Sequence, residues 1–184
     1  MEHGELYQYL IDKAPLSTLS RTESSRKIQL PWAILKNSKI IVMDRVQNQN
    51  IDLLAQRVGL NLPMHTTSVG KILLAHLPEE ERDRILKSTR FEKFTAATVV
   101  DRKVIKKNLA SIREKGFATD EGETHEDLNC IAAPIKDASG EVIAAINLMD
   151  ERSRTGAEKV RQLSDYLKGK AFFISRQLGF RSTF

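Results

Sequence analysis

The sequence predicts an α+β domain in which helices pack against an antiparallel sheet. Strand-like segments occur in two groups whose members are joined by short turns, and segments with helical periodicity lie between and after these groups. No Gly-x-Gly-x-x-Gly motif follows a strand, so a dinucleotide-binding fold is not supported. The 184 residues are enough for one domain with its own core.

The composition is that of an ordinary globular protein, with 41% hydrophobic and 29% charged residues. No apolar run approaches the ~20 residues needed to cross a bilayer, and no secretory signal begins the chain. Cys130 is the single cysteine and has no disulfide partner. We therefore expect a cytoplasmic protein with no membrane partner. The net charge of +5 is dispersed along the chain, which argues against a basic nucleic-acid surface.

The first third of the chain predicts short helices and then strands. Residues 1–13 have the pattern of the end of a linker helix, and a second short helix is expected at Leu16–Thr22, after Pro15. Pro31 cannot donate a ladder hydrogen bond, so the first strand should lie at a sheet edge or contain a bulge. Three strands are expected, at Lys27–Leu35, Lys39–Val46 and Ile51–Val58.

Two helices are predicted in the middle of the chain. Thr67 or Ser68 can cap the first, which should run to about Leu77. Pro78 suits the first position of the second helix, Glu79–Leu86, whose early carboxylates complement the helix dipole.

Two more helices follow. Asp101 caps the first and Gly116 ends it, and its apolar stripe consists of Ile105, Leu109 and Ile112. The last helix closes the chain before Gly179, and its apolar seam consists of Val160, Leu163, Leu167, Ala171, Ile174 and Leu178.

The second strand group predicts a hairpin. Its strands are expected at Phe117–Glu121, Asn129–Lys136 and Val142–Met149, with a turn at residues 137–140. If residues 138 and 139 form a two-residue loop, Cys130 lies opposite Asn147. Alternation then places four residues on one face, namely Cys130, Ala132, Asn147 and Met149. A one-residue bulge would break this register.

The start of the helix near Ser68 could hold an anion. The first N–H groups of a helix, here those of Ser68, Val69 and Gly70, are free to bind a ligand carboxylate, and Gly70 has no side chain to block its approach. The alternative is that Thr67 or Ser68 merely caps the helix. From the residues alone, this alternative is the stronger one.

Three residues of the second strand group are further candidates. Asn147 interrupts an apolar run, and a buried amide needs partners, which a ligand or a neighbouring loop could provide. Asp120 ends a strand beside an acidic loop and could point into a pocket. Cys130 could be a nucleophile activated by His65 or His125, but an apolar strand raises a thiol pKa and keeps it unreactive. Histidine pairs with metal-ligand spacing are lacking, so neither metal nor cofactor is expected.

Ordered motifs then resemble the effector-binding domain of the IclR family of bacterial transcriptional regulators. The segment Leu62–Ala75 resembles its Leu-Pro-(Met/Leu)-His stretch and Gly-Lys-x-x-Leu-Ala helix, and Ile112–Glu121 resembles Ile-Arg-x-x-Gly-Tyr-x-x-Asp-x-Glu. Cys130–Asp137, followed by Gly140 and residues 142–146, is a third match, and Ile174–Gly179 fits the family's usual ending. The resemblance covers the chain from about Ala14 onward.

The resemblance implies a GAF-like, profilin-like domain over residues 14–184, in which a curved antiparallel sheet has helices on both sides. It implies a pocket for a small organic, aromatic or sugar acid, with backbone N–H groups near Ser68 and Val69 meeting the carboxylate. Asp120 and Cys130 match pocket positions, and the apolar wall corresponds to Ile51, Leu54 and Leu62. Asn147 and Met149 stand where the family often has serines, which changes the polarity of the pocket.

The resemblance also implies how such a domain is used. The effector would modulate DNA binding by a separate N-terminal winged helix-turn-helix, which these residues do not contain, so DNA would be contacted only through that domain. The family assembles as dimers and tetramers through this domain, which implies self-association. A sensing domain that is not an enzyme is expected. The alternatives are a ligand-free interaction module and a GAF-fold enzyme that uses Cys130.

Overall fold

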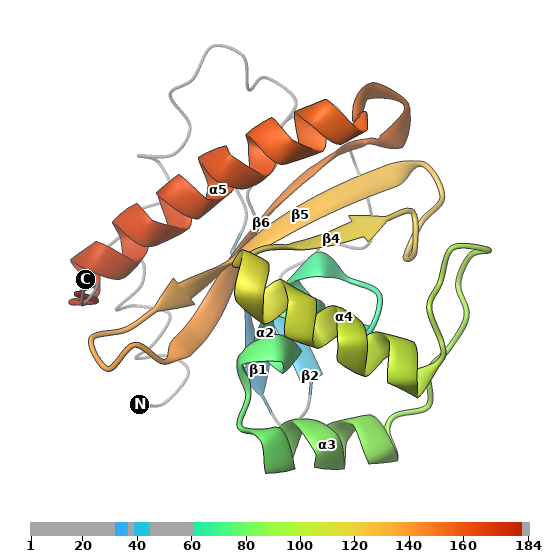
Figure 1. Cartoon of the computed structure of the whole chain (residues 1–184), viewed down its shortest axis with the longest axis horizontal. Coiled ribbons are helices and arrows are strands. Elements are labelled where there is room, and N and C mark those ends of the chain that lie inside the picture. The colour runs from blue at the N-terminus through green and yellow to red at the C-terminus, as the bar shows by residue number, and fades with distance from the viewer. Residues whose placement is uncertain (1–31, 37–38, 45–60, 182–184) are drawn as a thin grey trace.

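A computed structural model describes residues 32–36, 39–44 and 61–181 (Figure 1). Within them, six strands form one antiparallel sheet in the order β3-β2-β1-β6-β5-β4. The strands are β1 (Trp32–Lys36), β2 (Lys39–Asp44), β3 (Asn61–Leu62), β4 (Ala118–Glu121), β5 (Leu128–Lys136) and β6 (Val142–Glu151).

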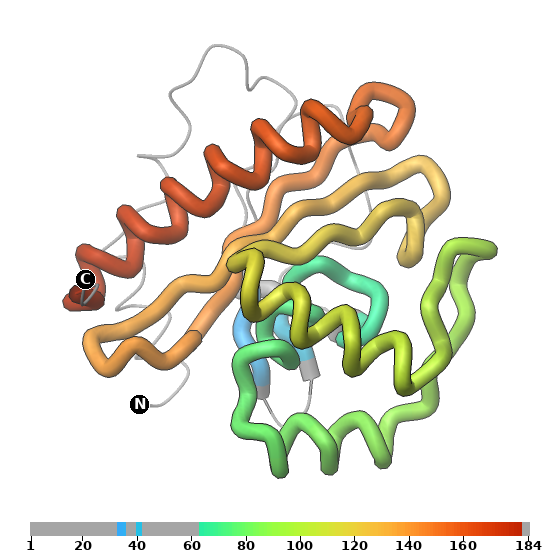
Figure 2. The backbone as a smooth tube through the Cα atoms, in the orientation of Figure 1, coloured from blue at the N-terminus to red at the C-terminus, as the bar shows by residue number. Residues whose placement is uncertain are grey.

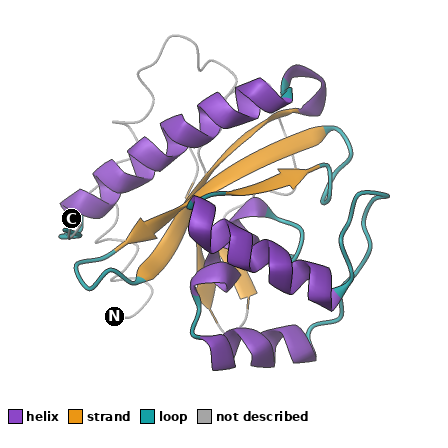
Figure 3. Cartoon of the chain, viewed as in Figure 1, coloured by secondary structure: helices purple, strands orange, loops and turns teal. Residues whose placement is uncertain are grey.

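Helices lie on both faces of this sheet. Figures 1 and 3 show α5 across one face and α2 and α4 on the opposite face, with α3 further from the sheet. The helices are α2 (Ser68–His76), α3 (Glu79–Ser88), α4 (Arg102–Lys115) and α5 (Ala157–Gln177), and a 3-10 turn, η4 (Arg152–Arg154), leads into α5. The predicted α+β class with helices on both sides is confirmed.

The alternation of strand side chains divides the core in two. Along β5, Ile131, Ala133 and Ile135 pack under α5, whereas Ala132 faces α2 and α4. The seam of α5 joins the first layer through Leu167, Ala171, Ile174 and Leu178. Burial of each large side chain contributes about 1.5–3 kcal/mol, so the two apolar layers hold the sheet between its helices.

The first strand was predicted to lie at a sheet edge or to contain a bulge, and the edge position is wrong. β1 pairs with β2 on one side and β6 on the other, so it lies inside the sheet and not at an edge. The described strand begins at Trp32, and Pro31 lies outside the described residues. The predicted bulge does occur, as a register shift between Trp32 and Ala33. The helices expected within residues 1–22 and the strand expected at 51–58 lie outside the described residues.

The predicted helix ends are largely confirmed. Thr67 caps α2, and its hydroxyl accepts from the N–H of Gly70 at 3.3 Å. Asp101 caps α4, and Gly116 ends that helix with a φ of 72°, a conformation that favours glycine. Pro78 stands one position earlier than predicted, as the N-cap of α3.

The predicted hairpin register is wrong by two residues. Cys130 pairs with Met149, and Asn147 pairs with Ala132. The connection is longer than two residues because the Asp137 carboxylate accepts from the N–H groups of Ser139 and Glu141, and a shift follows at Ile135/Lys136. Because the slip is an even number of residues, the predicted face is nevertheless correct. Cys130, Ala132, Asn147 and Met149 share it.

The turn of this hairpin lies beside the C-terminal end of α5 (Figure 2). The N–H of Lys136 donates to the Ser175 hydroxyl at 2.9 Å, and the Lys136 ammonium lies 5.2 Å from the centre of the Phe180 ring. The turn end of the β5–β6 hairpin is therefore held against α5. The candidate residues lie further from the turn, on the opposite face of the sheet.

Replacing Gly70 with alanine should lower the free energy of unfolding by about 1–3 kcal/mol, because the added methyl group has no room. A Cβ at Gly70 would lie 2.6 Å from the Cα and carbonyl oxygen of Met64. Gly169 in α5 is the matched control, since a Cβ there meets nothing within 4 Å. Gly169→Ala should stabilise the protein by about 0.5–1 kcal/mol. Urea unfolding of both variants measures the difference, and equal effects would contradict the packing argument.

Candidate functional site

Buried hydroxyls lie at the start of α2 and just before it. Ser68 and Thr66 are both fully buried, and neither side-chain oxygen has a hydrogen-bond partner among the described residues. Thr67, between them, is satisfied, because its hydroxyl donates to the Pro63 carbonyl at 2.6 Å. An unpaired buried hydroxyl costs free energy, so these oxygens point to a ligand or an ordered water at this turn.

Four of the candidate residues lie in two neighbouring rows of cross-strand partners, on the sheet face that α2 covers. Asp120, Cys130 and Met149 are partners across β4, β5 and β6, and Asn147 lies in the next row, opposite Ala132. Cys130 and Met149 form a small buried cluster with Leu128. The side-chain oxygen of Asn147 is buried and has no partner among the described residues. Because α2 packs against all three strands, these rows lie on the sheet face that α2 covers.

Asp120 is the buried acid of this region, with 2% of its surface exposed. Its Oδ1 accepts from the N–H groups of Glu123 at 2.8 Å and Thr124 at 3.2 Å. Burial raises the pKa of Asp120 above its ordinary value, against the opposing effects of these hydrogen bonds and the Lys71 charge. A raised carboxyl pKa favours folding below the unfolded-state value, and this contribution is lost as the pH rises through the folded-state value. A ligand that donates a hydrogen bond to the ionised carboxylate would offset that cost.

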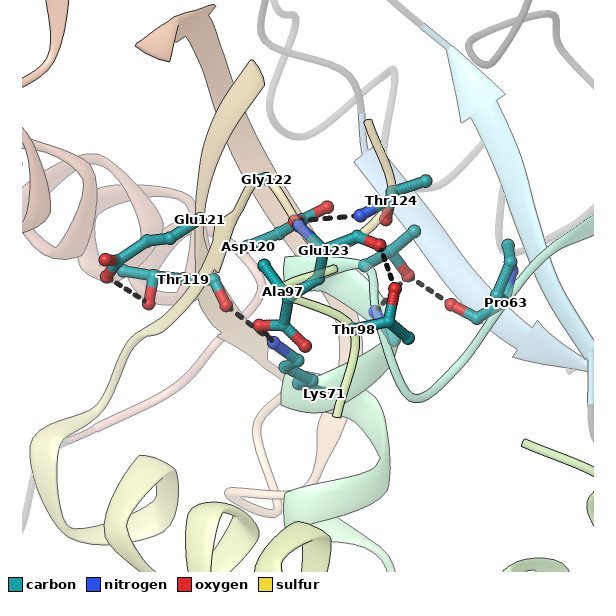
Figure 4. Close-up of polar contacts among 12 residues, drawn as sticks. Pro63, Lys71, Ala97, Thr98, Thr119, Asp120, Glu121, Gly122, Glu123 and Thr124 are labelled. Atoms are coloured by element: carbon teal, nitrogen blue, oxygen red, sulfur yellow. Dashed lines mark hydrogen bonds and ion pairs between the residues drawn. The ribbon is translucent and has the colours of Figure 1, made fainter. Parts of the chain in front are cut away.

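Lys71 and Glu123 form a buried ion pair that the sequence analysis did not identify (Figure 4). The Lys71 ammonium also donates to the Thr119 carbonyl at 2.9 Å. Burial raises the pKa of Glu123 even though Lys71 opposes the shift. The available signal was a single lysine in the otherwise uncharged segment Ser68–Ala75, because a buried lysine needs a partner.

The connection between α3 and α4 is hydrogen-bonded to the β4–β5 loop. The Thr95 hydroxyl donates to the Gly122 carbonyl, and the Thr98 hydroxyl to the Glu123 carbonyl, both at 2.7 Å. At its other end, the carbonyl of Glu92 lies 2.8 Å from Nε2 of the buried His65. Burial lowers the pKa of His65, so the neutral ring, which donates to this carbonyl, is favoured.

The remaining candidates lie in other settings. Val69 is part of the core between α2 and the sheet. Gly70 lies against the backbone of Met64, which gives it a packing role. Leu62 is in β3, paired with Ile40, and Ile51 and Leu54 lie outside the described residues. The ligand contacts expected of all ten candidate residues remain predictions.

The thiol of Cys130 should be unreactive in the native protein. Burial, and secondarily the charge of Asp120, raises the pKa of Cys130 well above its ordinary value. We expect negligible reaction with Ellman's reagent at neutral pH while the protein is folded, and one equivalent of thiol after unfolding in guanidinium. Rapid native-state labelling would contradict this assignment and favour a nucleophilic cysteine.

The described residues contain neither a metal-binding cluster nor a membrane-spanning helix. No group of three or more histidine, cysteine or acidic side chains could hold a metal ion there, and no helix is long and apolar enough to cross a membrane.

Comparison with known proteins identifies the family. Residues 11–176 match the family described as bacterial transcriptional regulator IclR, C-terminal. The chain is 30% identical over 147 residues to the HTH-type transcriptional regulator XynR of Escherichia coli, covering 80% of this chain and 58% of XynR. The chain thus spans little more than half of that regulator's length.

Solved structures agree with this match. The IclR of Thermotoga maritima superposes with a TM-score of 0.86 at 26% identity, covering 97% of this chain and 73% of that one. An IclR homologue from Microbacterium hydrocarbonoxydans, solved with 4-hydroxybenzoate, superposes with a TM-score of 0.83 at 25% identity, covering 96% and 70%. Motif, sequence and fold agree, and the chain therefore belongs to the IclR family of bacterial transcriptional regulators, in which it corresponds to the C-terminal domain.

Proposed function

We propose that this domain senses a small organic, aromatic or sugar acid and so modulates DNA binding by a separate part of the regulator. The observation that carries the proposal is a set of buried oxygens that have no partner among the described residues, on α2 and on the sheet face that it covers. Those of Thr66 and Ser68 lie just before α2 and at its start, and that of Asn147 lies on the sheet beneath the same helix.

The charges of the region suggest how an acid would be oriented. The first N–H groups of α2 and the positive end of its dipole favour a carboxylate there. The Asp120 carboxylate would repel a second anion, so we assign the ligand's hydroxyl or another donor to the side of Asp120 and Asn147. The IclR homologue solved with 4-hydroxybenzoate supports this class of ligand, since that molecule has an acid group at one end and a hydroxyl at the other.

The proposal is tested by a thermal-shift screen of organic, aromatic and sugar acids that includes 4-hydroxybenzoate, followed by calorimetry. A ligand at one hundred times its Kd should stabilise the fold by about 2.7 kcal/mol. Asp120→Ala and Asn147→Ala should each raise the Kd of a hit about three- to tenfold, because each removes a directed hydrogen bond. Asp165→Ala is the control, since its carboxylate is exposed on α5 at the opposite face.

Three results would count against the proposal. Unchanged affinity in both the Asp120 and Asn147 variants would refute the assigned site. The lack of any thermal shift across the panel would favour a ligand-free interaction module. Turnover that is lost in Cys130→Ser would favour an enzyme, although the raised thiol pKa argues against one.

The rest of the regulator's action is part of the same proposal. We assign DNA contact to a separate winged helix-turn-helix domain, which is consistent with the 58% of XynR that this chain spans. We also propose that the regulator acts in the cytoplasm as a self-associating protein, with neither metal nor cofactor.

A further inference from the structure

Glu123 contacts three different parts of the domain with its three polar groups (Figure 4). Its N–H donates to the Asp120 carboxylate at 2.8 Å. Its carbonyl accepts from the Thr98 hydroxyl at 2.7 Å. Its side chain pairs with Lys71. One residue of the β4–β5 loop therefore joins the acid of the candidate site, the α3–α4 connection and helix α2.

The ion pair holds the other two contacts together. Lys71 has 9% and Glu123 13% of its side-chain surface exposed, so water competes little for either charge. The ammonium also binds the Thr119 carbonyl, one residue before Asp120, which fixes the start of the same loop. Because the side chain is anchored in this way, the N–H and carbonyl of Glu123 are held in one arrangement. Glu123 therefore connects the Asp120 carboxylate to the Thr98 hydroxyl through two backbone hydrogen bonds.

Residues 94–98 of the α3–α4 connection are held together by the Thr98 hydroxyl. The Thr98 Oγ1 accepts from the N–H groups of Phe94 at 3.1 Å and Thr95 at 2.9 Å, in addition to its bond with Glu123. The Thr95 hydroxyl accepts from the N–H of Ala97 and donates to the Gly122 carbonyl. The conformation of residues 94–98 thus depends on carbonyls next to the site.

We propose that Glu123 is a positioning residue that couples the Asp120 side of the effector site to the α3–α4 connection. The inference rests on the proposed function for what occupies the site. In this proposal, the conformation of residues 94–98 reports whether the effector site is occupied. Glu123 itself makes no contact with the ligand in this scheme and acts through Asp120, Lys71 and Thr98.

Amide hydrogen exchange in the ligand-free protein tests the coupling. Asp120→Ala leaves the Glu123 N–H without its acceptor, and we expect exchange of the amides at 94–98 to rise about tenfold. In a Glu123→Ala background, where these amides already exchange faster, adding Asp120→Ala should have no further effect there. Glu123→Gln, which keeps a polar partner for Lys71, should give an intermediate result. The α5 amides at 164–171 are the internal reference, since global destabilisation would raise their exchange too.

Substitutions at Thr98 test the coupling in the opposite direction, and a substitution of the Asp83 carboxylate is the control. Thr98→Val should raise exchange of the Glu123 and Thr124 amides, and Thr98→Ser, which keeps the hydroxyl, should not. Asp83→Asn removes a carboxylate that pairs with Lys106 outside this network and should leave residues 94–98 unchanged.

Additive effects of the Asp120 and Glu123 substitutions at 94–98 would overturn the coupling, as would no response to Thr98→Val. Neither result bears on ligand binding, which the thermal-shift screen measures separately. Failure of the coupling and failure of the proposed function are therefore distinguishable.

Discussion

Lys71→Met is expected to lower the free energy of unfolding by about 3–5 kcal/mol, because it leaves the buried Glu123 carboxylate without its cation. The methionine has nearly the volume of the lysine stem, so the effect comes from the lost charge and its bond to the Thr119 carbonyl. Guanidinium unfolding followed by circular dichroism measures it. The double variant with Glu123→Gln should recover part of the loss, because no uncompensated charge is then buried.

An exposed ion pair provides the control. Lys106 in α4 pairs with Asp83 in α3 at 2.7 Å, but 44% of the Lys106 side-chain surface is exposed. Lys106→Met should therefore change the free energy of unfolding by less than about 1 kcal/mol. If the Lys71 and Lys106 variants are equally destabilised, burial is not what makes the first pair important. If the double variant is no more stable than Lys71→Met, the loss does not arise from the stranded carboxylate.

Leu167→Ala is the other large expected effect, a loss of about 2–5 kcal/mol. Leu167 is fully buried in the layer between α5 and the sheet, where it packs among Ile131, Ile146 and Leu148. Truncation removes apolar contacts and leaves a cavity that α5 can only partly close, since the hairpin turn fastens the helix at Ser175. Thermal and urea unfolding both measure the loss.

Phe173 on the same helix is the matched control, because a larger side chain is removed from a site that is 49% exposed. Phe173→Ala should cost less than about 1 kcal/mol. A cost for Phe173→Ala comparable to that of Leu167→Ala would mean that the outer side of α5 is covered in solution.

Together the two experiments separate the two faces of the sheet. The α5 layer is mainly apolar, because its buried Ser164 and Ser175 hydroxyls donate to carbonyls of the same helix, and it should set the global stability of the domain. The α2 face combines an apolar core with the Lys71–Glu123 ion pair and buried hydroxyls. The effector site that we propose lies on this second face.

Local patterns predicted most of the elements between residues 61 and 181. Thr67, Asp101 and Gly116 were identified as helix ends because a capping side chain or a left-handed glycine acts within four residues. The hairpin strands were found, and so was their shared face, but their partners were two positions off. Side-chain hydrogen bonds by Asp137 lengthened the turn, and a turn of that kind is not evident from alternation alone.

The candidate site was predicted in part for the same reason. Asp120, Cys130, Asn147 and Met149 lie where strand alternation places them, on the face beneath α2. Glu123 was not singled out, because two of its partners, Lys71 and Thr98, come from distant segments of the chain. No local sequence pattern predicts that β1 lies inside the sheet. The same is true of the pairing of Lys71 with Glu123, which are 52 residues apart.

The sequence by itself determined the fold class, the helix caps, the shared face of the hairpin and, through its motifs, the family. Each of these depends on interactions within a few residues or on a repeat of two or 3.6 positions. Only the tertiary structure decided which strand is central, which buried oxygens lack partners, and that Glu123 joins Asp120, Lys71 and Thr98. These follow from how distant segments exclude water from one another, and burial of that kind is a property of the packed chain.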